Sequence, residues 1–335
     1  GTVTGVQTCA LPIYEPVGGE LLRARRGAAR GWLKVQDGCD RKCSFCATRL
    51  ARGASRSRAL PEVVAEARLL ARRHAELVIT GIHIGHYGLD LDPALTLSRL
   101  CATLLEEVPE ARFRIGSVEA TEVDDLLIDL MATSGGQLAP HLHMPLQSGA
   151  DPVLRLMRRW HTREQYRVRA LEIAERVAPL GLGADVITGF PGETKEDHAA
   201  TRALIEELPF TYLHVFPFSP RKDTVAETLP APVPQRIAGD RARELRTIAQ
   251  ERGASYRAGR LGSRASLVLE GDGGTGLTED YLRVRVESRS RELFPEGVAS
   301  PRKPSSLPAL VHGTLRGHPD DLYIVSPRDP ALPSV

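Results

Sequence analysis

Three cysteines lie within eight residues of the stretch "DGCDRKCSFCATR" (37–49), at Cys39, Cys43 and Cys46. Thiolates are soft ligands, and three of them packed this closely suit an iron–sulfur cluster. Three protein ligands would leave one iron of such a cluster open. The spacing therefore predicts an iron–sulfur cluster whose open iron can bind a substrate.

Two other readings of the cysteines remain. A structural zinc site would need a fourth ligand, normally from a second close Cys/His pair, and Cys101 and His74 both fall in or at the end of expected helices. Three unrelated buried thiols fit poorly, because Asp40, Arg41 and Lys42 separate the first two cysteines.

The segments that must position this loop repeat one sequence pattern. Each has a short apolar run, then a polar or Gly-rich stretch, then a helix-period segment such as 60–74 or 162–180. Six such runs occur, at 32–38, 76–85, 112–121, 141–149, 183–193 and 212–220. Alternating strands and helices favour right-handed crossovers and a parallel sheet. We therefore expect an α/β fold with a partial barrel of the (β/α)6 type.

Active sites of such barrels lie at the C-terminal ends of the strands, where the cysteine loop follows the first strand. On the fourth run His141, His143 and Gln147 share one parity, while the intervening apolar residues share the other. We expect the two histidines to be hydrogen-bonded inside the barrel. Asp185 either orients a cofactor or pairs with an arginine there.

Composition excludes several classes of protein. The chain has 335 residues, of which 42% are hydrophobic, enough for one large core and a smaller module. It has no apolar run near the length of a membrane span and no secretory start. Five cysteines, three of them clustered, indicate a reducing compartment and a metal rather than disulfides. These features predict a cytoplasmic protein.

The cysteine pattern Cys-x3-Cys-x2-Cys after a first barrel strand resembles the radical S-adenosylmethionine superfamily. Further segments resemble its methylthiotransferases, and are most similar to those that modify N6-threonylcarbamoyladenosine in tRNA, beside the anticodon. They are "WLKVQDGCDRKCSFC", "RGASRSR", "LVITGIHIGHYG", "PLQSG", "DVITGFPGET" and "HVFPFS". The resemblance covers roughly Trp32 to Val325.

The resemblance implies a mechanism and partners. In that family the open iron binds the amino and carboxylate groups of S-adenosylmethionine, and an electron from the cluster yields a 5′-deoxyadenosyl radical. The radical takes hydrogen from adenosine C2, where a methylthio group is then attached. The implied partners are tRNA and a reductant such as flavodoxin or ferredoxin, with no membrane.

Several residues are candidate contacts of S-adenosylmethionine. Two glycines of "VITGFPGET" either let backbone approach the adenine or form a tight strand-to-helix turn. Ser117 and Glu119 could hold the ribose or sulfonium, or Glu119 could form a rim salt bridge. The full set of candidates is Gly81, Ser117, Glu119, Gln147, Gly189 and Gly192. Gly81 matches the family only loosely, since histidines stand where an acidic residue is often found.

Positive charge collects near the cysteines. Residues 20–58 hold eleven Arg/Lys against three acids, and residues 155–176 hold seven Arg against three Glu, although the whole chain is only +2. A basic rim suits a phosphate-rich partner, whereas a solvated helix face is the plain alternative. The candidate RNA contacts are Arg52, Arg56 and Arg58.

The rest of the chain divides as follows. Residues 32–230 form the barrel and 231–258 a connecting helix, whose pattern extends over 233–259. Residues 259–326 hold short alternating strands that suggest a small antiparallel β-barrel, similar in position to the family's RNA-binding TRAM module. Its charge is balanced, with nine Arg/Lys against nine Asp/Glu. Residues 327–335 are expected to be a disordered tail.

The start of the sequence requires separate treatment. Val3 to Ile13 resembles the in-frame translation of a DNA sequencing-library adapter, so residues 1–13 are interpreted as non-native and 14–31 as the remnant of a linker. Family members carry an upstream domain with a second [4Fe-4S] cluster. We therefore expect the chain as written to cleave S-adenosylmethionine but not to attach sulfur to RNA.

The sequence thus predicts a radical S-adenosylmethionine tRNA methylthiotransferase. The alternatives within the family are an isopentenyladenosine-tRNA enzyme and a ribosomal-protein methylthiotransferase. An alternative of another class is a non-catalytic RNA-binding module with structural zinc.

Overall fold

The computed structural model describes residues 30–91, 95–270, 274–286 and 310–325. The adapter-like start, almost all of the linker remnant and the tail at 327–335 lie outside these residues. Among the described helices, none combines the length and the apolar character needed to cross a membrane.

Two parallel three-stranded sheets form the first part of the fold. One contains β1 (Gly31–Lys34), β4 (Glu76–Thr80) and β5 (Arg112–Ile115) in that order. The other contains β6 (His141–His143), β7 (Gly181–Thr188) and β8 (Tyr212–Pro217). Isolated parallel bridges, including Ser117 with His143, join β5 to the β6 side. The six strands therefore follow one another in chain order, as predicted.

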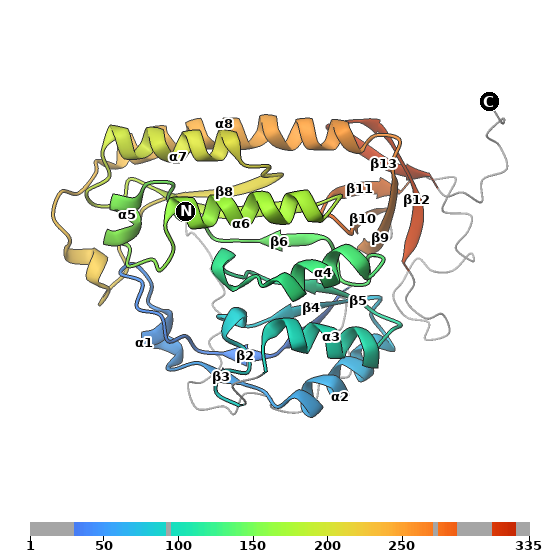
Figure 1. Cartoon of the computed structure of the whole chain (residues 1–335). Coiled ribbons are helices and arrows are strands. Elements are labelled where there is room, and N and C mark those ends of the chain that lie inside the picture. Colours follow the sequence, from blue (N-terminus) through green and yellow to red (C-terminus); the bar gives the residue numbers. More distant parts are fainter. Residues whose placement is uncertain (1–29, 92–94, 271–273, 287–309, 326–335) are drawn as a thin grey trace, which may run out of the picture.

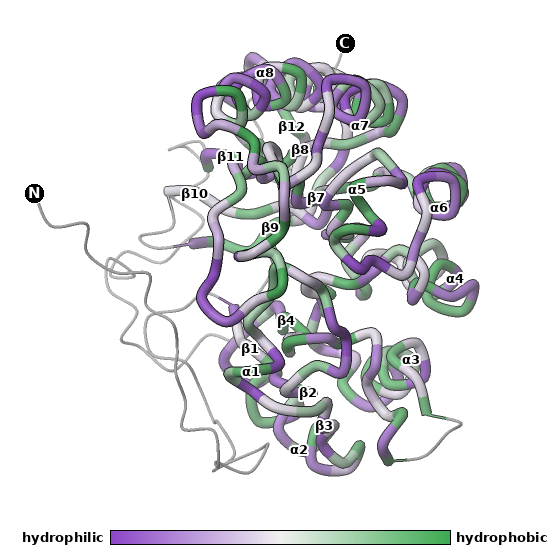
Figure 2. The backbone as a smooth tube through the Cα atoms, turned by 90° about the vertical axis from the view of Figure 1, so that its left-hand side faces the viewer, coloured by the Kyte–Doolittle hydropathy of each residue, from purple (hydrophilic) through white to green (hydrophobic). Residues whose placement is uncertain are grey.

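Helices cover one side of these strands. They are α2 (Leu60–Ala71), α3 (Leu97–Glu107), α4 (Asp125–Thr133), α6 (Arg163–Arg176), α7 (Lys195–Glu207) and α8 (Gln235–Arg260). Figure 2 shows them in an arc around the outside of the strands. The large hydrophobic core lies between the two layers, because the strands bury nearly continuous apolar runs against the helices.

Local sequence explains where these helices begin. Thr162 and Thr194 each cap a helix with a full capping box. In such a box the side chain of the residue three positions later accepts a hydrogen bond from the backbone N–H of the cap residue. Asp124 caps α4 by accepting a bond from Leu127 N. Pro61 occupies the first turn of α2, where a missing N–H costs nothing.

Short elements complete the rim at the C-terminal ends of the strands. They are β2 (Gln36–Asp37), α1 (Thr48–Arg52), β3 (Arg56–Ser57), η1 (Ile84–His86), η2 (Ala120–Glu122), α5 (Asp151–Leu156) and η3 (Val225–Thr228). The cysteine loop lies between β2 and α1, at this rim.

The C-terminal module (264–325 in its described parts) is a closed five-stranded barrel. Its strands are β9 (Arg264–Glu270), β10 (Thr275–Thr278), β11 (Arg283–Val286), β12 (Val311–His318) and β13 (Asp321–Val325). The sequence did not predict β10, because "TGLT" shows no clear alternation. The prediction of a wholly antiparallel barrel was wrong, since β11 pairs in parallel with β13.

This module packs against the N-terminal ends of the parallel strands, at the opposite end of the molecule from α1 (Figure 1). Glu76, fully buried at the start of β4, binds Arg112 Nε at 2.6 Å and Arg114 Nε at 2.9 Å. Arg112 Nη1 donates to Ser266 O at 3.1 Å, and Arg114 Nη2 donates to Thr278 O at 2.8 Å. One buried carboxylate therefore holds two arginines that clamp the module.

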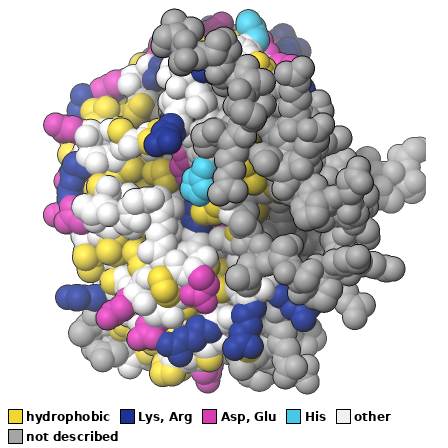
Figure 3. Space-filling model, turned by 90° about the vertical axis from the view of Figure 1, so that its right-hand side faces the viewer, with side chains coloured by type: hydrophobic (Ala, Val, Ile, Leu, Met, Phe, Trp, Pro, Cys, Tyr) yellow, Lys and Arg dark blue, Asp and Glu magenta, His cyan; other side chains and the backbone are white. Residues whose placement is uncertain are grey.

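The described surface at the module's end of the molecule shows Lys and Arg interspersed with Asp and Glu (Figure 3).

Candidate functional site

The cysteine loop begins at a position that only glycine can occupy. Gly38 has φ of +72°, and a Cβ there would lie 1.9 Å from the carbonyl oxygen of Ala54. Because L-residues rarely adopt this conformation and the contact is with backbone, any side chain would displace the loop. The next residue, Cys39, donates its N–H to Gly53 O at 3.1 Å.

The loop is anchored on α5 and on the segment after β7, which follow strands of the β6–β7–β8 sheet. Ser44 Oγ donates to Leu156 O at 2.7 Å, and Ser44 N donates to Met157 O at 3.0 Å. The ring of Phe45 packs edge-to-face against Phe190, with centroids 6.4 Å apart. The thiols are therefore presented on a backbone fixed by both halves of the strand layer.

Each of the three thiols has a partner. Cys39 Sγ lies 3.6 Å from His83 Nδ1, Arg159 Nη1 donates to Cys43 Sγ at 3.7 Å, and the Thr48 N–H approaches Cys46 Sγ at 3.4 Å. Burial raises the pKa of both Cys39 and Cys43, and the charge of Cys46 raises both further. Cys39 and Cys43 thus lie close enough to Cys46 to be affected by it, and both stay protonated at neutral pH until a metal displaces the protons.

The chemistry of these thiols fits a cluster better than a single zinc ion. A structural zinc site would need a fourth protein ligand, whereas three soft thiolates on one loop suit an iron–sulfur cluster. A larger inorganic core spreads its thiolates over its corners, so three partly exposed soft ligands on one loop fit an iron–sulfur cluster.

The structure brings to the cysteine loop a histidine that the sequence analysis did not assign to this site. His83 Nδ1 adjoins Cys39, but its Nε2 binds Glu122 at 2.8 Å. Burial would raise the pKa of Glu122, yet hydrogen bonds from His83 and His86 lower it to about 2. The carboxylate is therefore ionised and holds both imidazoles beside the loop.

Cationic and aromatic groups surround the thiols. The Trp160 ring lies between two guanidiniums, with Arg41 at 4.0 Å and Arg159 at 4.2 Å from its centroid. Arg159 also forms a buried ion pair with Glu119. The sequence left open whether Glu119 contacts the ribose or sulfonium of the cofactor or forms a salt bridge at the rim. The structure shows the salt bridge.

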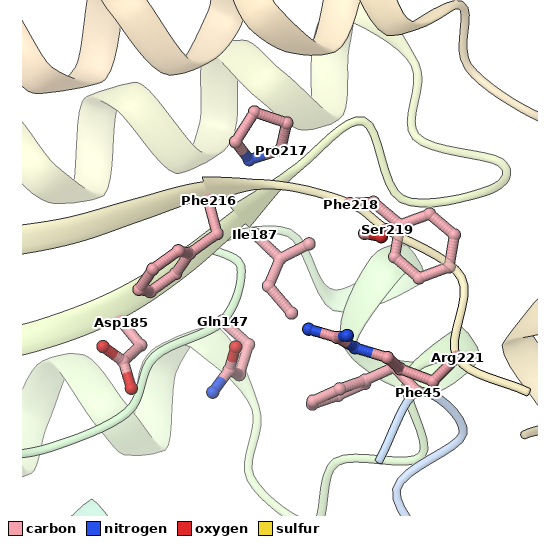
Figure 4. Close-up of a pocket in the computed structure, with 9 residues that line it drawn as sticks. All are labelled: Phe45, Gln147, Asp185, Ile187, Phe216, Pro217, Phe218, Ser219 and Arg221. Atoms are coloured by element: carbon pink, nitrogen blue, oxygen red, sulfur yellow. The ribbon is translucent and has the colours of Figure 1, made fainter. Parts of the chain in front are cut away.

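A pocket of about 350 Å³ adjoins the cysteine loop. Figure 4 shows the side chains of Asp185, Gln147 and Phe216 on one side of it, and Phe45, Phe218 and Arg221 on the other. Its size and its mixture of aromatic rings with a few polar groups are typical of sites for small organic ligands. Phe45 lines the pocket and lies between Cys43 and Cys46 in the sequence. The pocket is therefore directly beside the cysteines.

The predicted polar interior is confirmed. His141 Nε2 and His143 Nδ1 both bond to the hydroxyl of Tyr212, at 2.9 and 3.1 Å. Asp185, left open between two readings, lies 3.2 Å from His143 Nε2 and 3.3 Å from His214 Nδ1, and it lines the pocket. Among the described residues its partners are thus histidines and not an arginine.

The predicted contacts of S-adenosylmethionine differ in where the structure places them. Of the six candidates, Gln147 lines the pocket, and it has a positive φ of 67°. Gly189 and Gly192 have φ of +73° and +86°, which confirms the tight turn after β7. Gly81 packs against Gln36, and Ser117 is exposed beside β6. Direct contact of these residues with S-adenosylmethionine stays a prediction.

The predicted RNA contacts need one correction. Arg58 is buried and forms an ion pair with Glu66, and it also donates to Lys34 O, so it holds the core and is withdrawn as an RNA contact. Arg52 is partly exposed and lies 3.6 Å from Asp37. Arg56 stays at the rim. Among the described residues, the rim cations without an ion-pair partner also include Lys42, Arg155 and Arg158.

Sequence reasoning missed Phe45, Arg159 and Arg221. Phe45 could have been found, because a residue between Cys43 and Cys46 must lie beside these thiols. The other two come from distant segments, and no local spacing connects them to the cysteines.

Comparisons with known proteins agree with this site. The model of the radical SAM superfamily matches residues 33–205. The chain is 36% identical over 267 residues to the threonylcarbamoyladenosine tRNA methylthiotransferase of Rickettsia prowazekii, covering 78% of this chain and 62% of that protein. It is 34% identical to the tRNA-2-methylthio-N(6)-dimethylallyladenosine synthase of Bacillus pumilus, covering 75% and 50%. The chain thus spans between half and two thirds of the length of these curated relatives.

Among solved structures, coproporphyrinogen III oxidase from Escherichia coli, a radical SAM enzyme, shares the fold with a TM-score of 0.50 and 19% identity. The match covers 70% of this chain and 54% of that one.

Proposed function

Because the chain belongs to the radical S-adenosylmethionine superfamily, we propose that it is the core of a tRNA methylthiotransferase that acts on C2 of N6-threonylcarbamoyladenosine. The observation that carries the proposal is the loop of three neighbouring thiols next to a nucleoside-sized pocket. The identity of 36% to a curated threonylcarbamoyladenosine tRNA methylthiotransferase supports the choice of substrate.

The proposal also assigns the finer architecture. The six parallel strands are interpreted as a partial (β/α)6 barrel over residues 32–230, α8 as the connecting helix, and the C-terminal module as TRAM-like. The closed five-stranded barrel at the end of α8 supports the last assignment.

Cys39, Cys43 and Cys46 would hold a [4Fe-4S] cluster, which supplies the electron for cleavage of S-adenosylmethionine. The residues of the chain bind and orient the reactants. Phe45 offers a ring beside the loop, and Gln147 and Asp185 offer polar groups across the pocket. Burial raises the pKa of Cys43, and the positive charge of the buried Arg159 beside it offsets part of that rise.

The experiment that tests the proposal uses the chain reconstituted with iron and sulfide without oxygen. With S-adenosylmethionine and dithionite, we expect formation of 5′-deoxyadenosine, measured by liquid chromatography and mass spectrometry. A colourless protein that contains zinc and forms no 5′-deoxyadenosine would instead favour the non-catalytic RNA-binding module.

The choice of RNA is tested separately, because the dimethylallyladenosine relative is almost as similar at 34% identity. We expect the chain to bind an anticodon stem-loop containing N6-threonylcarbamoyladenosine more tightly than the same RNA containing N6-dimethylallyladenosine. The reverse preference would favour the second substrate.

The cationic rim provides a further prediction. Replacing Lys42 and Arg56 by glutamine should weaken tRNA binding and flatten its dependence on salt, by a slope of about 0.9 per lost phosphate contact. Binding would be measured by fluorescence anisotropy over a range of salt concentrations.

The matched control removes the same charge at the other end of the fold. Arg72 and Arg73 are exposed at the end of α2, close to the start of β4. Their replacement by glutamine should leave the salt slope unchanged. Equal slopes for both double variants would show that the rim cations are only solvated.

A further inference from the structure

Two histidines and a glutamate meet at the rim, next to the cysteine loop. His83 and His86 belong to the turn of η1 after β4, and Glu122 ends η2 after β5. His83 Nε2 lies 2.8 Å and His86 Nε2 3.3 Å from Glu122 Oε1, and one ligand atom from each of the three residues lies within 4.8 Å of the others. Ligands bonded to one tetrahedral zinc ion at about 2.1 Å are about 3.4 Å apart. The three side chains are therefore close enough to share one metal ion.

Local geometry explains why the three side chains converge. A 3₁₀ helix has three residues per turn, so residues three positions apart lie on one face. His83 is the N-cap of η1 and His86 its last residue, and their ring centroids are 3.9 Å apart. Gly85 leaves room for the carboxylate between them, because a Cβ there would lie 1.9 Å from Glu122 Oε2. Any side chain at this position would displace the glutamate from the histidines.

The types of ligand indicate the class of metal. Burial would raise the pKa of Glu122, but hydrogen bonds from His83 and His86 lower it to about 2, so the carboxylate is ionised. Two imidazoles and a carboxylate suit zinc and other divalent ions of the first transition row, whereas magnesium and calcium prefer oxygen ligands alone. The side chains are also shielded, with exposed fractions of 7%, 18% and 10%.

Groups around the three side chains hold them in place. Arg41 Nη2 donates to Glu122 Oε1 at 3.2 Å and lies over the Trp160 ring, and metal-binding carboxylates are usually hydrogen-bonded in this way. An imidazole that binds a metal through Nε2 carries its proton on Nδ1. For His83 this proton faces Cys39 Sγ, 3.6 Å away, which can accept it. The charge of Arg41 opposes a second cation, so we expect weaker binding than at a site without an arginine.

We propose that His83, His86 and Glu122 form a binding site for a divalent cation of the zinc class, separate from the cysteine loop. Three protein ligands leave at least one position for water. The ion would connect the segment after β4 to the segment after β5 at the rim. This inference does not depend on the proposed function, because it assigns no role to the cysteines as ligands of this ion or to the pocket.

A second group in the described residues has the same composition. It consists of His143, Asp185 and His214. The exposed fractions of the Asp185 and His214 side chains are 29% and 54%, so these ligands are held less firmly than those at the rim. We therefore assign the cation to His83, His86 and Glu122, and the experiment includes a variant of the second group.

The experiment measures zinc and iron in the same sample. The chain reconstituted with its cluster is dialysed without oxygen against zinc, whose free concentration is fixed by a chelator. Both metals are then measured by inductively coupled plasma mass spectrometry. Unchanged iron shows that zinc has not replaced the cluster at the cysteines. We expect the wild type to bind one zinc ion per chain in addition to its iron.

His86→Ala and Glu122→Gln each remove one ligand, and Glu122→Gln also keeps the shape of the side chain. We expect each variant to bind zinc at least tenfold more weakly than the wild type. Loss of a partner outside the ligands already weakens metal binding about 10–100-fold, and loss of a ligand should cost at least as much. The iron content should stay that of the wild type.

His198→Ala is the matched control. His198 Nε2 lies 2.8 Å from Glu244 Oε2, and the His198 side chain is 11% exposed, much like those at the rim. This contact joins one histidine to one carboxylate and belongs to neither group of three. We expect His198→Ala to bind zinc like the wild type.

Three results would overturn the inference. If the wild type binds no zinc beyond its iron, or if His86→Ala and Glu122→Gln bind zinc as tightly as the wild type, the three side chains form only a hydrogen-bonded network. Zinc uptake with an equivalent loss of iron would place the zinc at the cysteines. Loss of zinc in His214→Ala but not in His86→Ala would assign it to the second group. None of these results bears on the proposed function, which is tested by formation of 5′-deoxyadenosine.

Discussion

Replacement of Cys39, Cys43 or Cys46 by alanine is expected to abolish binding of the iron–sulfur cluster, each by itself. The reconstituted wild type should contain about four irons and four sulfides per chain, and each variant close to none. The reason is geometric: on the proposed assignment only three protein ligands would hold the cluster, and they come from one loop. Iron and sulfide analysis with the visible absorption spectrum measures the result.

Cys101→Ala is the matched control. Cys101 is buried in α3, and burial together with the charge of Asp124 raises its pKa to about 12, so it is not a candidate ligand. We expect this variant to bind as much iron as the wild type. An essential Cys101 would contradict the assignment of an open iron.

Glu76→Gln is expected to lower the free energy of unfolding by about 3–5 kcal/mol, the range measured when one partner of a buried ion pair is removed. The change keeps the shape of the side chain but leaves Arg112 and Arg114 buried without their counter-charge. Both arginines also hold the C-terminal module, so its contact should loosen at the same time. Urea denaturation followed by circular dichroism gives the difference in free energy.

The effect should depend on pH in a defined direction. Burial would raise the pKa of Glu76, but Arg114 and Arg112 lower it below the usual value. A depressed pKa gives stability that is fully present above the unfolded-state pKa and is lost as the pH falls through the folded-state pKa. The difference between wild type and Glu76→Gln should therefore be constant near pH 7 and shrink below about pH 4.

Glu107→Gln provides the comparison. Glu107 pairs with Arg68 on an exposed surface, where an ion pair contributes only about 0–1 kcal/mol. A loss of less than 1 kcal/mol for Glu76→Gln at neutral pH would mean that the buried network does not hold the two parts together.

Much of the fold was predictable because its signals are local. The six parallel strands repeat one pattern of apolar run and helix, and helix starts are marked by caps such as Thr162 and Thr194. The cysteine spacing is equally local, since all three cysteines lie on one loop. By contrast, β10 was missed because its four residues owe their strand to pairing with β9 and β11.

Charge was the feature that the sequence predicted least well. Counting arginines in residues 20–58 indicated a basic rim, but the count cannot show which of them are paired. Arg58 is neutralised by Glu66 inside the core, whereas Lys42 and Arg56 stay at the surface. Burial and ion pairing are properties of segments that meet only after folding.

The sequence by itself determined the alternating α/β order, the close spacing of the three cysteines and the family resemblance, because each depends on residue types at short, fixed spacings. The tertiary structure alone decided that Arg159 adjoins Cys43, that Glu76 clamps the C-terminal module, and that Glu122 meets His83 and His86. These contacts join residues tens to hundreds of positions apart. Their distances are set by how the strands and the module pack together, and no local pattern in the chain encodes that.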